Sequence, residues 1–273
     1  HDGLAADPIY DMGITSSGTG FRVNPFSNDP RVLSAALRNT PFDYFIACPD
    51  KPSYAGRLDT KAMKPEEALK ARGIVRRFLE TIRRWNPKTT MRAAVFEENG
   101  PRHDMSRALC HALMLEEVRA AGKDVLTSCP ANAFQVWKQN DNGWDQGNVF
   151  MTPDKVWLAP CAWAQRMASD GHRELLVASS CDDKDVHVSA TRDRAGESPV
   201  LHFVNLSGER KTLSLAFADG KVRRVAKAVT LSGGSLEADN GPDAPERVAP
   251  RDETADLAKS LELKPYSYTV IAF

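Results

Sequence analysis

The sequence has no excess of either charge, because its 36 Lys and Arg residues equal its 36 Asp and Glu residues. Nucleic acids and anionic membranes are bound through a basic surplus, so this balance argues against both as the main partner. There is no run of about 18 apolar residues, so no stretch is long enough to span a bilayer. The chain does not open with a basic segment followed by an apolar one, so we expect any signal peptide to be absent or already removed.

Cysteine is scarce and scattered. The sequence holds five cysteines, and none forms a C-x-x-C pair; they are Cys48, Cys110, Cys129, Cys161 and Cys181. This spacing argues against a zinc site and excludes a dense disulfide scaffold. We expect most of them to be small buried residues. One disulfide is compatible with the spacing, so the redox compartment stays open.

The first half of the chain alternates between strand and helix patterns. Residues 1–40 are interrupted by glycine and proline, and we expect them to be irregular. The β-rich run Phe42–Cys48 predicts a strand, and Pro65 then starts a helical pattern that stops at Pro87. With 273 residues, the chain can hold one large domain or two modest ones.

The stretch from Met91 to Gly100 carries most of the functional argument. The apolar run Ala93–Phe96 leads directly into Glu97 and Glu98. It predicts a buried strand that presents carboxylates at its C-terminal end, as an α/β barrel presents catalytic groups. Strand alternation sends the two side chains to opposite faces, so only one of them can face a barrel axis.

Another helix and another strand follow these acids. Asp104 is a suitable N-cap for a helix that continues to Ala121 and stops at Gly122, and Val125–Cys129 is the next strand. From Phe42 onwards the order is therefore strand, helix, strand, helix, strand, which predicts right-handed parallel units.

The pattern changes in the second half. Residues 135–150 form a polar loop with two tryptophans, and Thr152 opens a predicted helix from Lys155 to Ala168. Beyond Gly171, short alternating runs separated by turn residues predict an antiparallel sandwich; they are 175–180, 186–191, 200–206, 212–217, 222–231 and 266–273. We therefore expect two parts, a partial (β/α) barrel over 1–170 and a β-sandwich over 171–273.

The strand that ends in an acid, the tryptophan loop and the sandwich that closes on Leu261–Ile271 occur in an order that resembles one family. Over roughly residues 42–273, the chain resembles the C-terminal half of α-L-arabinofuranosidases of glycoside hydrolase family 51. This resemblance implies the C-terminal part of a (β/α)8 barrel followed by an antiparallel jelly-roll-like β-sandwich. It also implies a retaining glycosidase that acts on arabinose-containing oligo- or polysaccharides, without metal or organic cofactor.

The resemblance places the site residues as well. Glu98 falls where the family keeps its nucleophile, and Trp144 falls in the loop that supplies a substrate-facing tryptophan. Asn99, Gln146 and His103 are further candidates for substrate binding, since amide side chains bind sugar hydroxyls while aromatic side chains stack on sugar faces. A substrate of this kind would favour a secreted or periplasmic location, which the sequence leaves unknown.

Each of these residues has a structural alternative. Glu98 could form a surface salt bridge with Arg92 or Arg102, and Glu97 could be the catalytic acid instead. Trp144 could fold back on the core, as we expect of Trp137, Trp157 and Trp163. His103 could serve only at the start of the helix.

One family feature is missing. The acid/base glutamate of the family lies in a Gly-Asn-Glu motif, which this sequence lacks. Only about three of the eight strand–helix units of a closed barrel are visible. Either a missing N-terminal segment or a second polypeptide completes the barrel, or the protein is a non-catalytic carbohydrate-binding or structural subunit.

Overall fold

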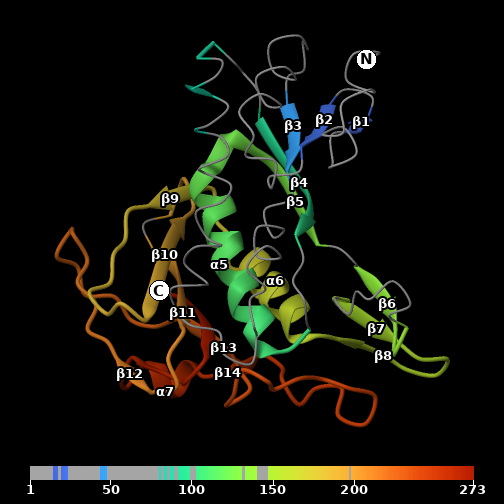
Figure 1. Cartoon of the computed structure of the whole chain (residues 1–273). Helices are drawn as coiled ribbons and strands as arrows, with labels where there is room; N and C mark the ends of the chain where they lie inside the picture. Colours follow the sequence, from blue (N-terminus) through green and yellow to red (C-terminus); the bar gives the residue numbers. More distant parts are fainter. Residues whose placement is uncertain are drawn as a thin grey trace.

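A computed structural model describes the chain from residue 103 to the C-terminus, except for residues 131–132, 140–146 and 197. Before residue 103 it describes the backbone of a few strands and single positions between 80 and 88. Most of the helix predicted after Pro65 therefore lies outside the described residues, although Glu80, Arg83 and Arg84 are helical. Figure 1 shows the layers formed by the described elements.

The first sheet has five strands in the order β1-β2-β3-β4-β5. The strands are β1 (Thr15–Ser17), β2 (Gly20–Val23), β3 (Tyr44–Ala47), β4 (Arg92–Glu98) and β5 (Val125–Pro130). β1 pairs antiparallel with β2, and the pairs from β2 to β5 are parallel. The predicted parallel order of the last three strands is confirmed.

The expectation that residues 1–40 are irregular is wrong for β1 and β2. β1 is a short polar run, and β2 has only two alternating apolar residues, Phe21 and Val23, so the local pattern was too short to mark them as strands. Their hydrogen bonds come from pairing with each other and with β3, which is a non-local contact.

Helix α5 (Met105–Ala121) forms as predicted. The Asp104 carboxylate accepts a hydrogen bond from the Arg107 backbone N–H at 3.4 Å and another from the Ser106 hydroxyl at 2.5 Å. The helix ends at Gly122, whose φ of 54° suits a residue without a Cβ atom. Capping at both ends therefore follows from the local sequence.

The next segment differs from its prediction. It contains β6 (Phe134–Val136), β7 (Val149–Met151), β8 (Val156–Leu158) and α6 (Pro160–Asp170). The helix predicted over 155–168 begins only at Pro160, because Val156–Leu158 pairs antiparallel with β7. Thr152 starts a turn instead of a helix: its backbone N–H donates to the Lys155 carbonyl at 2.9 Å.

The C-terminal part contains a six-stranded antiparallel sheet in the order β14-β13-β16-β11-β10-β9. Its strands are β9 (Leu175–Val177), β10 (Val186–Arg192), β11 (Pro199–Asn205), β13 (Lys227–Ser232), β14 (Arg251–Asp252) and β16 (Ser267–Ala272). This confirms the predicted antiparallel sheet. The strand expected at 212–217 is reduced to β12 (Lys211–Thr212), which pairs with β15 (Glu262–Leu263), and the strand expected from Val222 starts at Lys227.

Both faces of this sheet are covered. On one face, Val204, Leu231 and Tyr268 pack against α5 and α6. On the other, Phe203 and Ile271 join Leu257 of α7 (Thr254–Leu257) and Leu263 of β15 in a second core. The alternation of side chains along each strand supplies both cores. Because the first core joins residues on either side of Gly171, the two expected parts share it, and the boundary at 171 stays a prediction.

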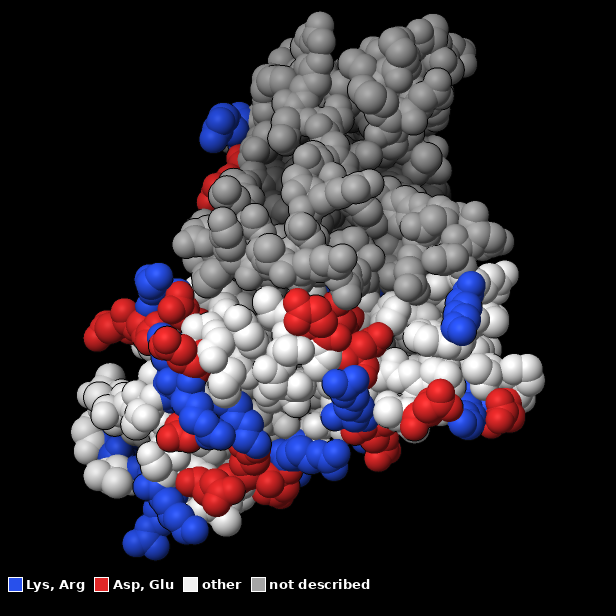
Figure 2. All heavy atoms as spheres, turned by 60° about the horizontal axis from the view of Figure 1, so that its bottom comes forward, with Lys and Arg blue, Asp and Glu red and all other residues white. Residues whose placement is uncertain are grey.

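The face turned forward in Figure 2 carries basic and acidic side chains side by side. The sequence has equal numbers of acidic and basic residues, and on this face the two kinds are interspersed. The visible described surface therefore offers no extended field of one sign.

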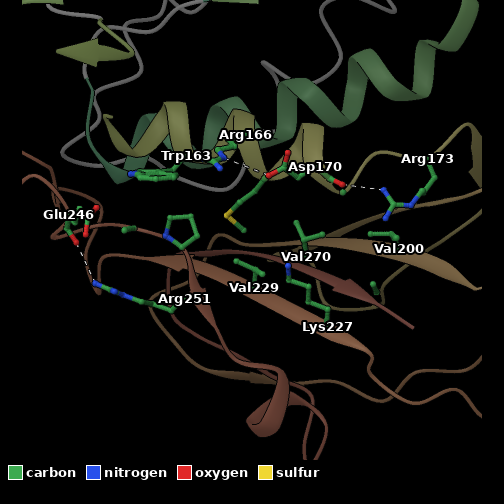
Figure 3. Close-up of a pocket in the computed structure, with 15 residues that line it drawn as sticks. Trp163, Arg166, Asp170, Arg173, Val200, Lys227, Val229, Glu246, Arg251 and Val270 are labelled. Atoms are coloured by element: carbon green, nitrogen blue, oxygen red, sulfur yellow. Dashed lines mark hydrogen bonds and ion pairs between the residues drawn. The ribbon is translucent and has the colours of Figure 1, made fainter. Parts of the chain in front are cut away.

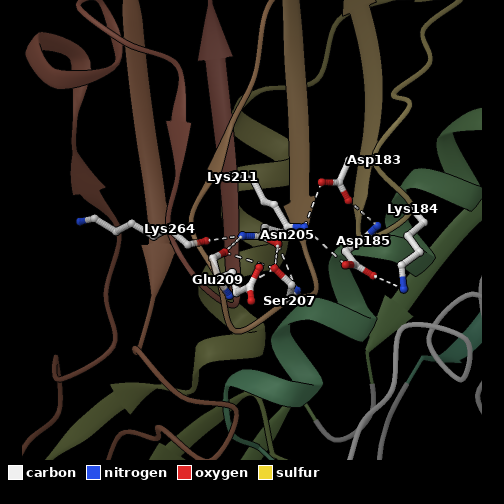
Figure 4. Close-up of polar contacts among 8 residues, drawn as sticks. All are labelled: Asp183, Lys184, Asp185, Asn205, Ser207, Glu209, Lys211 and Lys264. Atoms are coloured by element: carbon white, nitrogen blue, oxygen red, sulfur yellow. Dashed lines mark hydrogen bonds and ion pairs between the residues drawn. The ribbon is translucent and has the colours of Figure 1, made fainter.

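A buried asparagine links two strands at the end of the six-stranded sheet (Figure 4). The Asn205 amide donates to the carbonyl oxygens of Glu209 at 2.9 Å and Lys264 at 2.8 Å. Its Oδ1 accepts from the backbone N–H and the hydroxyl of Ser207, at 3.0 and 2.9 Å. The side chain therefore joins the end of β11 to the segment before β16 with its polar atoms satisfied.

We expect Asn205→Ala to lower the free energy of unfolding by about 2–4 kcal/mol, because it removes four hydrogen bonds made by a fully buried side chain. Urea unfolding followed by circular dichroism measures this change. Glu209→Ala is the matched control, since the exposed Glu209 contributes backbone groups to this network. Equal stability of the two variants would contradict the role given to Asn205.

Candidate functional site

The candidate site begins at the carboxyl ends of β4 and β5. Glu98 is the last residue of β4 and pairs with Pro130, the last residue of β5. Ala47 at the end of β3 pairs with Val95, so β4 extends beyond β3. Figure 1 shows β4 and β5 running together toward the region of β6, β7 and β8. The backbone of Glu98 therefore lies at the edge where parallel sheets carry functional groups.

The register of β4 shifts between Val95 and Glu98. A bulge of this kind re-aims the side chains that follow it. Simple alternation therefore does not decide which of Glu97 and Glu98 faces which side of the sheet. Both side chains lie outside the described residues, and so do Asn99, Trp144 and Gln146.

His103 is the predicted site residue whose side chain is described. Its Nδ1 lies 2.7 Å from Asp239 Oδ2, and only 11% of the side chain is exposed. The ring meets Phe150 edge to face at 4.8 Å and Trp137 at 5.8 Å between centroids. His103 is thus held from several sides just before α5 begins.

His103 belongs to a cluster with Trp137, Phe150 and Trp157, which we call the aromatic cluster. Trp137 lies edge to face against Phe150 at 5.4 Å and against Trp157 at 5.3 Å. Phe150 and Trp157 are buried and form a small core with Cys161. The expectation that Trp137 and Trp157 serve in packing is confirmed.

Gln135 contacts residues on both sides of the segment 140–146, which includes Trp144 and Gln146. Before the loop, the Gln139 carbonyl accepts from Gln135 Nε2 at 3.0 Å. After the loop, Gly147 packs so closely on Gln135 that an added Cβ would lie 2.7 Å from the Gln135 Cβ. Gln135 therefore links Gln139 to Gly147, and its close contact requires glycine at 147.

A buried polar group supports the same loop from α5. Arg107 Nη2 donates to Asn148 Oδ1 at 3.1 Å, and the Cys161 thiol donates to the same oxygen at 3.2 Å. The Asn148 amide nitrogen lies 3.4 Å from Gln165 Oε1 on α6. Asn148 follows the loop directly, so these contacts tie its end to both helices.

Burial raises the pKa of the Cys161 thiol, although the Arg107 charge opposes this shift. The thiol therefore stays protonated and donates to Asn148 instead of acting as a nucleophile. Among the described cysteines, Cys161 and Cys181 have free thiols.

Sequence reasoning missed Arg107 and Asn148. Charged residues on helices are usually solvated, and nothing in the spacing marks Arg107 as buried. The burial of Arg107 could have been inferred only from its position between Met105, Ala108 and Leu109, which are all buried in one turn of α5. Asn148 carries no such signal.

Within the part of the chain that the structure describes, no cluster of His, Cys, Asp or Glu is arranged to hold a metal ion. In the same residues, no helix has the length and apolar character needed to cross a membrane.

The environment of His103 leads to a prediction. We expect His103→Ala to lower the melting temperature by several degrees, because it removes the 2.7 Å contact with Asp239 and the ring contacts to the aromatic cluster. Differential scanning fluorimetry measures this shift. We expect the KM for a small glycoside to stay within about 2-fold. A large rise in KM at unchanged stability would instead support direct contact with substrate.

The sequence matches the family model for the α-L-arabinofuranosidase C-terminal domain over residues 85–267. No curated protein sequence matches the chain. Solved structures of glycoside hydrolase family 51 arabinofuranosidases match its fold. The enzyme from Xanthomonas axonopodis pv. citri gives a TM-score of 0.64 at 14% identity, and that from Thermotoga petrophila RKU-1 gives 0.61 at 16%. An arabinose complex of the Thermotoga maritima enzyme gives 0.60 at 16% identity.

These three matches cover 90% of this chain but only 56% of each solved chain. The chain thus spans little more than half the length of the enzymes it resembles. At such low identity, the likeness shows a shared fold and leaves the activity to be argued from the site.

Proposed function

The chain belongs to the α-L-arabinofuranosidase C-terminal domain family, and we propose that it carries the nucleophile half of a retaining α-L-arabinofuranosidase site. The observation that supports this proposal is the position of Glu98 at the carboxyl end of a parallel strand. In barrel enzymes, catalytic residues come from these strand ends. The proposed substrate is an arabinose-containing oligo- or polysaccharide.

The proposed reaction uses two carboxyl groups. The Glu98 carboxylate attacks the anomeric carbon, while a carboxylic acid protonates the departing glycosidic oxygen. The same acid, now a carboxylate, takes a proton from water, and the resulting attack releases Glu98 and the sugar with retained configuration. This chemistry requires a separation of about 5–5.5 Å between the two groups. We propose that Asn99, Trp144 and Gln146 bind the sugar.

We further propose that the acid/base residue lies outside this chain. In the first sheet, parallel pairing extends from β2 to β5, and the other parallel pair among the described strands, β6 with β7, lies in a separate three-stranded sheet, whereas a closed barrel has eight strands. The missing Gly-Asn-Glu motif and the partial coverage of the solved enzymes support the same proposal. The remaining strands would come from another segment or a second polypeptide. The division into a barrel part over 1–170 and a sandwich part over 171–273 belongs to this proposal.

The proposed activity can be tested directly. The protein is incubated with 4-nitrophenyl α-L-arabinofuranoside, alone and together with any polypeptide that purifies with it. We expect release of nitrophenol in the complete assembly, and proton NMR should show that the first product has the retained configuration. An inverted first product would overturn the retaining mechanism.

A second candidate function is a non-catalytic carbohydrate-binding or structural subunit, and the missing Gly-Asn-Glu motif favours it. In this case the complete assembly would bind arabino-oligosaccharides without turnover. Binding would also survive replacement of both Glu97 and Glu98. Calorimetric titration of the doubly substituted protein separates the two functions.

A further inference from the structure

A groove of about 510 Å³ lies between helix α6 and the six-stranded sheet. Figure 3 shows Trp163, Arg166 and Asp170 projecting from α6 on one side, and Lys227, Val229 and Val270 on the sheet opposite them. The volume lies within the range of sites that hold small ligands. The groove is separate from the carboxyl ends of β4 and β5, because no residue of either strand lines it.

The inner surface of the groove is apolar. Val229 and Val270 belong to neighbouring strands β13 and β16 and pair directly with each other. Met167 of α6 and Val200 of β11 extend this surface. Trp163 adds a flat aromatic ring next to it, with the Arg166 guanidinium 5.6 Å from the ring centroid. Such a surface suits the C–H face of a small ring molecule.

The rim of the groove has a basic surplus, since four basic and two acidic side chains line it: Arg166, Arg173, Lys227, Arg251, Asp170 and Glu246. Two of the cations form ion pairs: Arg166 lies 3.7 Å from Asp170, and Arg173 lies 3.5 Å from Asp193. Lys227 is exposed, and its charge helps to lower the pKa of the neighbouring Asp252 without a direct hydrogen bond or ion pair between described residues. An ammonium group beside an apolar surface is a natural partner for a carboxylate.

We propose that this groove binds a uronic acid unit of a polysaccharide, with the sugar ring on Trp163 and the valine surface and its carboxylate at Lys227. The choice of a sugar over other small acids rests on the proposed function. Charge complementarity supports an acidic sugar over the neutral arabinose of the catalytic reaction.

The experiment is calorimetric titration of the full chain with a matched pair of trisaccharides. One carries a single glucuronic acid unit, and in the other that carboxylate is reduced to an alcohol. We expect the acidic trisaccharide to bind at least about 10-fold more tightly than the reduced one. Raising the salt concentration should weaken its binding, because an exposed charge contact is screened. Equal affinity for both trisaccharides, or no binding of either, would overturn the proposal.

Two variants locate the binding. Lys227→Gln should weaken binding of the acidic trisaccharide by about 5- to 10-fold and leave the reduced one unchanged. Lys259→Gln removes an equal charge from another exposed position and should change neither affinity. If both substitutions have the same effect, the groove is not the site. Concentration-dependent dimerisation that Lys227→Gln abolishes would overturn the proposal in favour of a second copy of the chain.

The same titration on Glu98→Gln separates this proposal from the proposed catalysis. If Glu98→Gln still binds the acidic trisaccharide but no longer hydrolyses the aryl arabinofuranoside, the groove is supported as a separate site. If Glu98→Gln no longer binds the acidic trisaccharide, the acidic sugar binds at the carboxyl ends of β4 and β5, and the groove assignment is overturned. Absence of hydrolysis in the unsubstituted protein bears only on the proposed function.

Discussion

Replacing Glu98 by glutamine is expected to lower hydrolysis of an aryl α-L-arabinofuranoside by about 10⁴-fold or more. The amide has nearly the same shape as the carboxylate but lacks the charge needed to attack the anomeric carbon. The measurement is kcat/KM for the complete assembly, with circular dichroism to show that the variant is folded. Activity within 10-fold of the unsubstituted protein would reject Glu98 as the nucleophile.

Glu97→Gln is the matched control for this experiment. It changes the neighbouring residue of the same strand in the same way, and we expect a loss of less than 10-fold. A reversed pattern would assign the nucleophile to Glu97, an outcome that the bulge between Val95 and Glu98 keeps open. Adding azide to Glu98→Ala should restore turnover and give a glycosyl azide of inverted configuration, because azide replaces the missing nucleophile.

Mild acid is expected to unfold the core that α5 shares with the six-stranded sheet. Burial lowers the pKa of His111 to about 3, aided by the charge of Arg107, and lowers the pKa of His202 to about 3, aided by Arg119. In its neutral form His202 satisfies both ring nitrogens, since its Nε2 donates to the Gly171 carbonyl at 3.2 Å and its Nδ1 accepts from the Tyr268 hydroxyl at 2.7 Å.

The direction of this effect follows from proton binding. In the unfolded chain both histidines titrate near 6.5, so below this pH the unfolded state binds more protons than the folded state. Their contribution to stability is complete above pH 6.5 and is lost as the pH falls toward 3. Between pH 6.5 and 3, each histidine lowers the free energy of unfolding by about 1.4 kcal/mol for each pH unit of acidification. Two units of acidification would thus remove about 5 kcal/mol, which is comparable to the whole stability of many domains.

Urea unfolding at several pH values between 7 and 4 measures this dependence. We expect His111→Leu or His202→Leu to reduce the slope of unfolding free energy against pH by about half. Replacing the exposed His172 should change this slope less, because solvent stabilises the charged form of His172 in the folded state. A slope that is unchanged in both buried variants would show that other groups control acid unfolding.

The parts of the fold that the sequence predicted well depend on neighbouring residues. Asp104 caps α5 through the backbone of Arg107, and Gly122 ends the helix in a conformation that suits glycine. The six-stranded sheet shows the alternation expected of strands with two covered faces. Each of these features depends on residues a few positions apart in the sequence, so the spacing of residue types is enough to predict it.

Features that depend on distant residues escaped prediction. Val156–Leu158 forms a strand and not a helix because β7 supplies its hydrogen bonds, and β1 and β2 form through pairing with each other and with β3. The bulge in β4 is likewise a property of its pairing with β5. Propensity cannot anticipate a hydrogen bond whose partner lies elsewhere in the chain.

The sequence by itself determined the family resemblance, the acids at the end of β4 and the alternating strands of the C-terminal part. Only the tertiary structure decided that Arg107, His111 and His202 are buried, that Gln135 contacts both sides of the segment 140–146, and that α6 leaves a basic groove against the sheet. The reason is physical. Burial and charge pairing depend on which elements pack together, and that packing arises from contacts between residues far apart in the chain.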